Sequence, residues 1–314
     1  MSEVDRGADA PLAIALRALQ LGDLLVAVPA LKALRAALPA HRLLLATSPG
    51  LGPVVDLVPA VDGLVPTRGL DRPLPFAPGE VDVAVNLHGG GPESAALVDA
   101  LGARVVVRHA IRSGEPGPRW VEALHERVRW VRLVAAAGMP GDPHDVRIAR
   151  SATPSPAPAA AVVHVGAAFA SRQWPVDRFA AVAAALAARG REVVFSGSAA
   201  ERPRALEVAR LAGLPESRVL AGATTLDAFV ALIADAGLVV TADTGAGHLA
   251  SAYGTPSVVL FGPVGPERWG PPPGPHVALT HPALRAGDAF AGAPDPALAA
   301  VTAAEVLAAV DRLP

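Results

Sequence analysis

The chain has 314 residues, of which 52% are hydrophobic, and its formal net charge at pH 7 is −2. This length accommodates two α/β domains with separate cores. The small charge argues against nucleic acid as a main partner, because binding a phosphate backbone needs an excess of Lys and Arg. The sequence contains no cysteine, which excludes disulfides, thiolate zinc sites and cysteine nucleophiles.

The N-terminal stretch from Met1 to Ala10 carries four charged residues and no apolar run, so it lacks the pattern of a signal peptide. Apolar runs elsewhere stay well short of the roughly 18 residues that a membrane-spanning helix needs. We therefore expect a soluble cytoplasmic protein. Peripheral contact with the inner face of a membrane is compatible with this pattern.

The N-terminal half alternates apolar runs with segments of helical period, which is typical of βαβ units and a parallel sheet. The predicted strands are Leu12–Leu16, Leu43–Thr47 and Val81–Leu87. A loop through Gly22 and Asp23 is predicted after the first strand, followed by a helix that ends near Leu38. A long amphipathic helix is predicted over Trp120–Ala137, where Gly138 ends it.

The stretch Ser151–Ala160 lacks periodicity and is rich in Pro and Ala, so it is predicted to link domains at 1–150 and 161–314. Strands are then predicted at Ala161–Val165, Glu192–Ser196, Arg218–Leu220, Leu238–Thr241 and Ser257–Phe261. Helices are predicted at Asp177–Ala188, Ala199–Ala212, Leu226–Ala236, Gly247–Tyr253 and Thr302–Asp311, with a long loop over Pro263–Pro296. The expected fold is α/β, with two Rossmann-like domains facing across a cleft at the carboxyl ends of their strands.

The most specific local pattern is Asp243–His248, which reads DTGAGH between a buried strand and a helix. Glycines let backbone N–H groups approach an anion, and the helix N-terminus adds its dipole, which suits a diphosphate. Asp243 would repel phosphate, so we expect it to accept hydrogen bonds from sugar hydroxyls. His248 is placed to reach a phosphate or a sugar. The alternative is a plain strand–turn–helix junction capped by Asp243.

A second tract follows the predicted strand Ala161–Val165, where Gly166 precedes Ser171 and Arg172. Gly166 and Ser171 are predicted to contact the donor. A cation in this loop would face the same cleft. Arg172 is therefore predicted to pair with the diphosphate and to stabilise charge on the leaving group. The alternative is a solvated arginine beside a tryptophan that packs on the following helix.

Three further positions are candidates for binding or catalysis. Asp23, preceded by Gly22, could act as general base on an acceptor hydroxyl, or could simply cap its helix. Glu201 could accept hydrogen bonds from ribose hydroxyls, or be an ordinary charge in a first helical turn. His88 and Gly89 follow a strand and either line the acceptor side or form a surface turn.

Neither a metal nor another cofactor is predicted. Asp142, His144 and Asp145 loosely resemble metal ligands, but they occupy a Pro-Gly loop with no matching cluster. The sequence also has no Walker A motif and no G-x-S-x-G elbow, which counts against P-loop and esterase chemistry.

Together these tracts resemble the ADP-heptose:lipopolysaccharide heptosyltransferase family, also called glycosyltransferase family 9. The resemblance covers most of the chain and keeps the family's order of motifs. The similar tracts are Arg17 to Leu31 with its L-G-D and P-A-L, Asn86–Gly89 with Ser94-Ala95, His125–Arg127, His164–Ala167 with Arg172–Pro175, and Asp243–Gly245 with His248-Leu249, Gly254–Pro256 and Phe261–Pro263.

The resemblance implies a GT-B fold, with the acceptor bound by the N-terminal domain and the donor by the C-terminal one. It implies metal-independent transfer with inversion, in which Asp23 deprotonates the acceptor hydroxyl. It also implies that Arg172 holds the donor diphosphate and that Glu201 holds the ribose. The backbone of Thr244, Gly245 and Ala246 would bind phosphate, while Asp243 would contact the donor sugar.

Three positions depart from the family's pattern. Arg172 stands where the family usually has Lys, Val165 where it has Pro, and Glu93 where heptosyltransferases often carry Lys. The expected function is transfer of heptose or a similar sugar from a nucleotide-diphosphate sugar, ADP-linked in the family, to a hydroxyl. The acceptor would be a glycan, a lipid-linked saccharide or a small molecule. The alternatives are another GT-B enzyme, such as a nucleotide-sugar epimerase, and a non-catalytic nucleotide-sugar binding protein.

Overall fold

The computed structural model describes residues 10–314, so the prediction for the N-terminal stretch, apart from Ala10, lies outside the described residues. The chain divides into two compact units, of which the first ends at Ala149 and the second comprises Arg150–Pro314. Each unit contains one five-stranded sheet with parallel pairing, which confirms the predicted α/β class. Within the described residues, no helix is long and apolar enough to cross a membrane.

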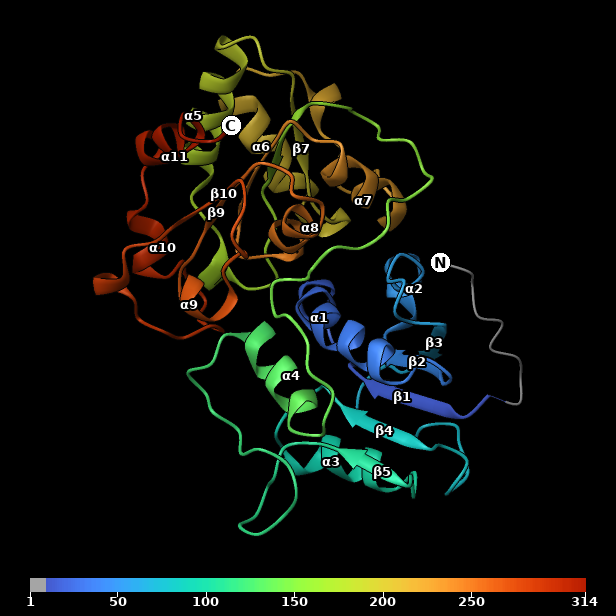
Figure 1. Cartoon of the computed structure of the whole chain (residues 1–314). Helices are drawn as coiled ribbons and strands as arrows, with labels where there is room; N and C mark the ends of the chain where they lie inside the picture. Colours follow the sequence, from blue (N-terminus) through green and yellow to red (C-terminus); the bar gives the residue numbers. More distant parts are fainter. Residues whose placement is uncertain (1–9) are drawn as a thin grey trace. The chain divides into compact units, whose positions relative to one another are not determined.

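The first unit has the strand order β3-β2-β1-β4-β5. Its strands are β1 Leu12–Leu16, β2 Arg42–Thr47, β3 Gly63–Pro66, β4 Val83–Asn86 and β5 Val105–Val107. Its α-helices are α1 Leu21–Ala37, α2 Gly52–Val55, α3 Pro92–Asp99 and α4 Glu126–Ala135. Helix α1 packs against α4 (Figure 1).

The strand order of this first sheet reverses between β1 and β4. The chain crosses from β1 to β2 in one direction and from β4 to β5 in the other. Right-handed crossovers therefore place α1 and α3 on opposite faces of the sheet. Ligands of open α/β sheets bind outside the carboxyl ends of the strands at such a reversal. In this unit the reversal lies where β1 leads to Asp23 and β4 leads to His88.

The second unit has the strand order β10-β9-β8-β6-β7. Its strands are β6 Ala161–His164, β7 Val193–Ser196, β8 Leu238–Ala242, β9 Ser257–Leu260 and β10 His276–Leu279. Its α-helices are α5 Val176–Ala188, α6 Arg202–Leu211, α7 Leu226–Ala234, α8 Gly245–Tyr253, α9 Pro266–Trp269, α10 Pro296–Ala300 and α11 Ala303–Val310. Helix α5 packs against α6 and α11, and α7 packs against α8 (Figure 1).

The second sheet reverses its order between β6 and β8, whose following loops carry Gly166 and Asp243. Strands β7, β8 and β9 are buried along their whole length, which accounts for their continuous apolar sequence. The core beneath α5 contains Trp174, whose indole N–H donates to the carbonyl of Val301 at 2.9 Å. Because these strands are buried, the loops that follow β6 and β8 begin at a well-packed sheet.

Two predicted elements of the first unit were wrong in their extent. Gly22 and Asp23 lie in the first turn of α1 and not in a loop, because Asp23 and Gln20 form a capping box that starts the helix at Leu21. The helix predicted from Trp120 begins only at Glu126. The preceding segment is not helical, since three of its carbonyls accept hydrogen bonds from the buried Arg129 side chain.

The second unit also differs from the predicted elements. The strand predicted at Arg218–Leu220 is a 3-10 turn, Glu216–Arg218, followed by a single bridge between Val219 and Phe195. The predicted loop Pro263–Pro296 contains α9 and the edge strand β10. Helix α8 starts at Gly245, two residues before the predicted start. Ser151–Ala160 contains neither helix nor strand and lies in the second unit.

Candidate active site

Asp23 lies at the carboxyl end of β1, in the first turn of α1. Its Oδ2 accepts a hydrogen bond from the backbone N–H of Gln20 at 3.3 Å, so the residue does cap its helix. Its Oδ1 accepts from Nη2 of Arg17 at 3.2 Å. The Asp23 side chain keeps 25% of its surface exposed. Capping therefore leaves part of this carboxylate accessible to a second molecule, and Gly22 adds no side chain beside it.

Arg17 is a buried arginine directly after β1. Its Nε donates to the backbone carbonyl of Asp23 at 2.8 Å, and its Nη1 donates to the carbonyl of Leu87 at 2.5 Å. The guanidinium lies 4.7 Å from the centroid of the Trp130 ring. Burial lowers the pKa of Arg17, whereas the nearby charges of Asp23 and Glu126 raise it. These contacts tie the first turn of α1 to the end of β4.

The glycine loop after β4 carries His88 and Gly89. Asn86 organises its start, because the Asn86 amide donates to Ser94 Oγ at 2.9 Å and its Oδ1 accepts from the His88 N–H at 3.0 Å. Burial lowers the pKa of His88, and the charge of Arg17 lowers it further. The loop is packed from behind, since a Cβ on Gly90 would lie 2.7 Å from the Trp120 ring. Both predicted acceptor-side residues, His88 and Gly89, thus lie on a supported turn and stay partly exposed.

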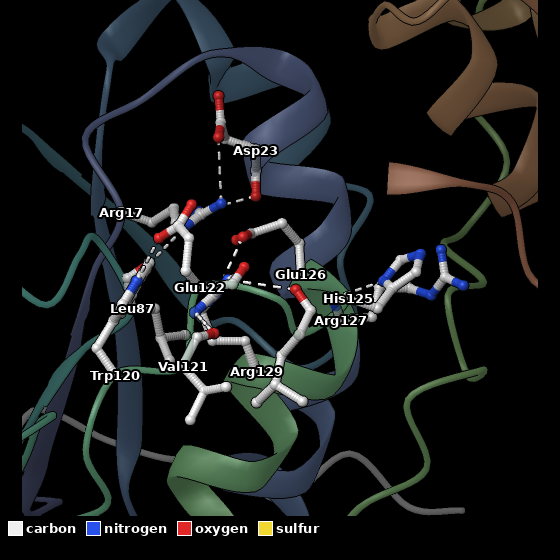
Figure 2. A network of polar contacts seen from close by, with 11 residues as sticks. Arg17, Asp23, Leu87, Trp120, Val121, Glu122, His125, Glu126, Arg127 and Arg129 are labelled. Atoms are coloured by element: carbon white, nitrogen blue, oxygen red, sulfur yellow. Dashed lines mark hydrogen bonds and ion pairs between the residues drawn. The ribbon is translucent and has the colours of Figure 1, made fainter. Parts of the chain in front are cut away.

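A cluster that supports this loop was not predicted from the sequence. Arg129 on α4 is completely buried, with its guanidinium 3.8 Å from the centroid of the Trp120 ring. Its Nε donates to Glu126 Oε1 at 3.0 Å (Figure 2). The charge pair at positions i and i+3 of a helix is visible in the sequence, but that spacing usually marks an exposed face.

The second unit brings together Asp243, Arg172 and His248 at the carboxyl end of β8. Asp243 Oδ2 lies 3.6 Å from Arg172 Nη1, and Asp243 Oδ1 lies 3.8 Å from His248 Nε2. Asp243 and His248 are buried. Arg172 is 29% exposed in its side chain, and its Nε is buried with no hydrogen-bond partner among residues 10–314. One guanidinium N–H is thus left for a further acceptor.

The N-terminus of α8 begins in the same place. Thr244 is the N-cap, and its hydroxyl accepts from the Ala246 N–H at 3.3 Å and bonds to Thr241 Oγ1 at 2.9 Å. Gly245 is the first helical residue, so its backbone lies at the positive end of the helix dipole. Of the three predicted phosphate-binding residues, Ala246 therefore has an N–H that already donates a weak hydrogen bond to the Thr244 hydroxyl.

A pocket lies beside this cluster, with residues of α8 and β9 in its lining. It is lined by Asp243, Thr244, Gly247, His248, Ser251, Val259, Phe261, Trp269 and Pro271. The Trp269 ring lies 5.9 Å from the His248 ring, with an edge-on geometry. Trp269 was missed because its segment was predicted to be a loop, although a tryptophan beside Pro and Gly is itself a signal of a packed turn. The pocket thus combines one carboxylate, one imidazole and aromatic walls.

Gly166 and Glu201 are in direct contact at the carboxyl end of β6. A Cβ on Gly166 would lie 2.2 Å from Glu201 Oε2, far closer than atoms approach one another. The same oxygen accepts from the Ser198 N–H at 2.6 Å, within the capping box of the 3-10 turn Ala199–Glu201. Glycine at 166 is therefore what lets the Glu201 carboxylate lie against the strand end.

Ser171 serves as an internal anchor in this structure. It is completely buried, and its hydroxyl donates to the Ala289 carbonyl at 2.6 Å. Its N–H donates to the Ala291 carbonyl at 3.2 Å, and its own carbonyl accepts from the Asp295 N–H at 3.0 Å. The turn that carries Arg172 is thereby fixed to the segment 289–295. The predicted donor contact of the Ser171 hydroxyl would have to replace its bond to Ala289.

His164 gives the second unit a specific dependence on pH. Burial lowers its pKa to about 4, and its Nδ1 lies 2.9 Å from Ser196 Oγ. Between pH 6.5 and 4 the unfolded chain binds a proton here that the folded chain does not, so acidification destabilises the fold. We expect the unfolding free energy to fall over this window and to fall less in His164→Asn. Urea denaturation at several pH values tests this, and equal slopes for both proteins would contradict it.

The loosely metal-like residues of the loop after α4 have other partners. Asp145 pairs with Lys32 at 2.5 Å, and Asp142 Oδ1 accepts from the His144 N–H at 2.9 Å. Across the described residues, no group of three or more His, Cys, Asp or Glu side chains is arranged to hold a metal ion. Glu93, where the family often has Lys, is exposed in the first turn of α3.

The protein has two units, each with a parallel sheet and with polar loops where its strand order reverses. These features define the GT-B fold class. The family model of glycosyltransferase family 9 (heptosyltransferase) matches residues 136–282, which confirms over that stretch the resemblance noted from the sequence. The lipooligosaccharide heptosyltransferase 2 of Haemophilus influenzae is 37% identical over 102 residues. This match spans 31% of the chain and only 29% of that relative.

Solved structures resemble the chain over nearly its whole length. The ADP-heptose lipopolysaccharide heptosyltransferase II of E. coli has a TM-score of 0.75 at 20% identity, covering 96% of this chain and 97% of its own. The E. coli heptosyltransferase WaaC with ADP has a TM-score of 0.71 at 22% identity, covering 96% and 99%. At these identities the likeness shows the shared fold.

Proposed function

We propose that the protein is a glycosyltransferase that moves a sugar from a nucleotide-diphosphate sugar to an acceptor hydroxyl. The observation that carries the proposal is the cluster of Arg172, Asp243 and His248 at the N-terminus of α8. It combines a cation with a free N–H, a helix dipole and a buried carboxylate beside a pocket. A diphosphate would take the cation and the dipole, and a sugar would take the carboxylate.

The donor would be held by contacts within the second unit. Arg172 and the backbone at Thr244, Gly245 and Ala246 would bind the diphosphate. The Asp243 carboxylate and His248 would accept or donate hydrogen bonds to the sugar. Glu201, at the end of the neighbouring β6–β7 pair, would accept hydrogen bonds from the ribose hydroxyls. The match to family 9, whose described activity is heptosyl transfer, supports heptose as the sugar, and the similar E. coli enzyme WaaC, solved with ADP, supports ADP as the nucleotide.

The acceptor would be bound by the first unit, next to Gly22, His88 and Gly89. In the proposed reaction Asp23 takes the proton of the acceptor hydroxyl, whose oxygen forms a bond to the anomeric carbon of the donor sugar. The bond from that carbon to the diphosphate oxygen breaks, and the nucleoside diphosphate leaves with the electron pair. Arg172 stabilises its charge. One displacement of this kind inverts the anomeric configuration and uses no metal ion.

Relatives and neighbours are named for lipopolysaccharide and lipooligosaccharide substrates, so a saccharide of that class is the proposed acceptor. Such a lipid-linked acceptor would bring the protein to the inner face of a membrane. We place the protein in the cytoplasm, where nucleotide sugars are made.

A thermal-shift screen of nucleotide sugars tests donor binding. A ligand that binds only the folded state stabilises it by about 2.7 kcal/mol at one hundred times its dissociation constant. We expect ADP-linked sugars to raise the melting temperature and Arg172→Ala to abolish most of that rise. A response to UDP or GDP sugars alone would remove the ADP assignment. A response to no nucleotide sugar would overturn the proposal.

A further inference from the structure

We propose that Arg17 is a positioning residue for the transfer reaction. Its guanidinium fixes the Asp23 carboxylate relative to the glycine loop that follows Leu87. The proposed base therefore keeps a constant position relative to the acceptor side. The inference rests on the proposed function, because that function makes Asp23 the base. It assigns a role to a residue that touches neither the donor nor the transferred proton.

The guanidinium of Arg17 holds Asp23 through two separate atoms. Nε donates to the backbone carbonyl of Asp23 at 2.8 Å, and Nη2 donates to its Oδ1 at 3.2 Å (Figure 2). The Gln20 N–H holds the other carboxylate oxygen at 3.3 Å. Both oxygens therefore have a fixed donor, and rotation of the carboxylate is restricted. What stays accessible is the quarter of the side chain that faces solvent.

The third contact of Arg17 reaches the other strand of the reversal. Nη1 donates to the Leu87 carbonyl at 2.5 Å, and Leu87 immediately precedes His88. Arg17 and Leu87 lie 70 residues apart in the sequence but directly follow the adjacent strands β1 and β4. The charge of Arg17 also lowers the pKa of His88. One planar side chain thus connects the proposed base to the loop proposed for the acceptor.

A buried charge of this kind is not in general required for stability. Arg17 is 1% exposed, and desolvation lowers its pKa. Replacing a buried charge network by apolar side chains of similar volume is often neutral or stabilising. The flat guanidinium nevertheless lies over the Trp130 ring, with its three donating nitrogens aimed at fixed oxygens. A lysine would supply the charge without this fork, because an ammonium has no planar set of donors.

Arg129 provides a matched control. It is equally buried, bonds to Glu126 and to three backbone carbonyls, and stacks on a tryptophan, yet within residues 10–314 its hydrogen bonds reach neither Asp23 nor Leu87. Substitution of either arginine removes a buried cation from the same cluster. A purely structural role predicts similar consequences for both. A positioning role predicts a loss of turnover for Arg17 alone.

The experiment compares Arg17→Ala, Arg17→Lys and Arg129→Ala, each at a temperature where it is folded. A base displaced by about 1 Å costs roughly 100-fold in rate, so we expect kcat of Arg17→Ala to fall by about that factor with the donor KM unchanged. Arg17→Lys should be intermediate, and methylguanidinium should restore part of the activity of Arg17→Ala. ADP affinity by calorimetry should be unchanged in Arg17→Ala. Arg129→Ala removes support from Trp120 behind the glycine loop, so it should raise the acceptor KM and keep kcat within about threefold.

Wild-type kcat in Arg17→Ala, or an equal loss in both alanine variants without rescue, would overturn the inference. If Arg17→Ala does not fold, Arg17→Lys decides, because it retains the charge and should still lose turnover. If wild type itself transfers no sugar, the proposed function fails, and a crystal structure then tests the inference separately. Asp23 in a new rotamer in an Arg17 variant supports positioning, and an unchanged Asp23 contradicts it.

Discussion

Asp23→Asn is expected to lose sugar transfer by about 100- to 10,000-fold, the usual contribution of a general base. The amide has the shape of the carboxylate, but only its oxygen can accept, so it keeps the hydrogen bond from Gln20 or the one from Arg17 and not both. With the oxygen turned to Gln20, the start of α1 should remain intact. It cannot take a proton from the acceptor. Measured with saturating donor, kcat should fall while the affinity for ADP, which we propose the second unit provides, stays unchanged.

The control for this variant is Asp145→Asn. Asp145 pairs with Lys32, which lies in the same helix as Asp23, and both side chains of the pair are partly exposed. An exposed ion pair contributes little to stability, so this variant should keep its turnover. Wild-type turnover in Asp23→Asn would show that Asp23 is only a helix cap. Loss of ADP affinity in that variant would point to damage to the fold.

Gly166→Ala is expected to weaken nucleotide binding by about 10- to 100-fold. The added methyl carbon would lie 2.2 Å from Glu201 Oε2, so the carboxylate has to leave the end of β6. Loss of a hydrogen bond to a charged group costs about 1.5–3 kcal/mol, which corresponds to the expected change in affinity. Calorimetric titration with ADP measures it directly.

A substitution of Glu201 distinguishes displacement of its carboxylate from general damage to the fold by Gly166→Ala. If Gly166→Ala acts by displacing Glu201, then Glu201→Gln should weaken binding by itself, and the double variant should be little worse than either one. Gly292→Ala is the control, because its added carbon has no neighbour within 4 Å and should leave the affinity unchanged. Full additivity of the two substitutions would contradict the ribose contact.

The sequence predicted strands where burial leaves a continuous apolar run, as in β1 and β8, and these agree closely with the structure. It did not predict the start of α1, because Gln20 is not among the residues that commonly cap helices. It also missed β10, a strand of four residues placed between prolines at the edge of the sheet. Short edge strands carry too little periodicity to be recognised.

For the candidate site, the sequence indicated the positions and the structure supplied the partners. Glycine-rich turns after strands pointed to Asp243 and Gly166 through local chemistry. The pairing of Arg172 with Asp243 depends on strand order in the sheet, which local sequence does not encode. The contact of Arg17 with Leu87 likewise joins strands that are far apart in the chain. Long-range pairings of this kind follow only once the reversal of each sheet is known.

The most direct test of the proposed activity is a transfer assay with ADP-heptose and a lipopolysaccharide lacking heptose. ADP release and the mass of the acceptor are measured together, with wild type and Asp23→Asn in parallel. We predict that ADP appears only when both substrates are present, with an acceptor heavier by one heptose, and that Asp23→Asn forms both products at least about 100-fold more slowly. Conversion of the donor without an acceptor, or no reaction with this or any other nucleotide sugar, would contradict the proposed glycosyltransferase.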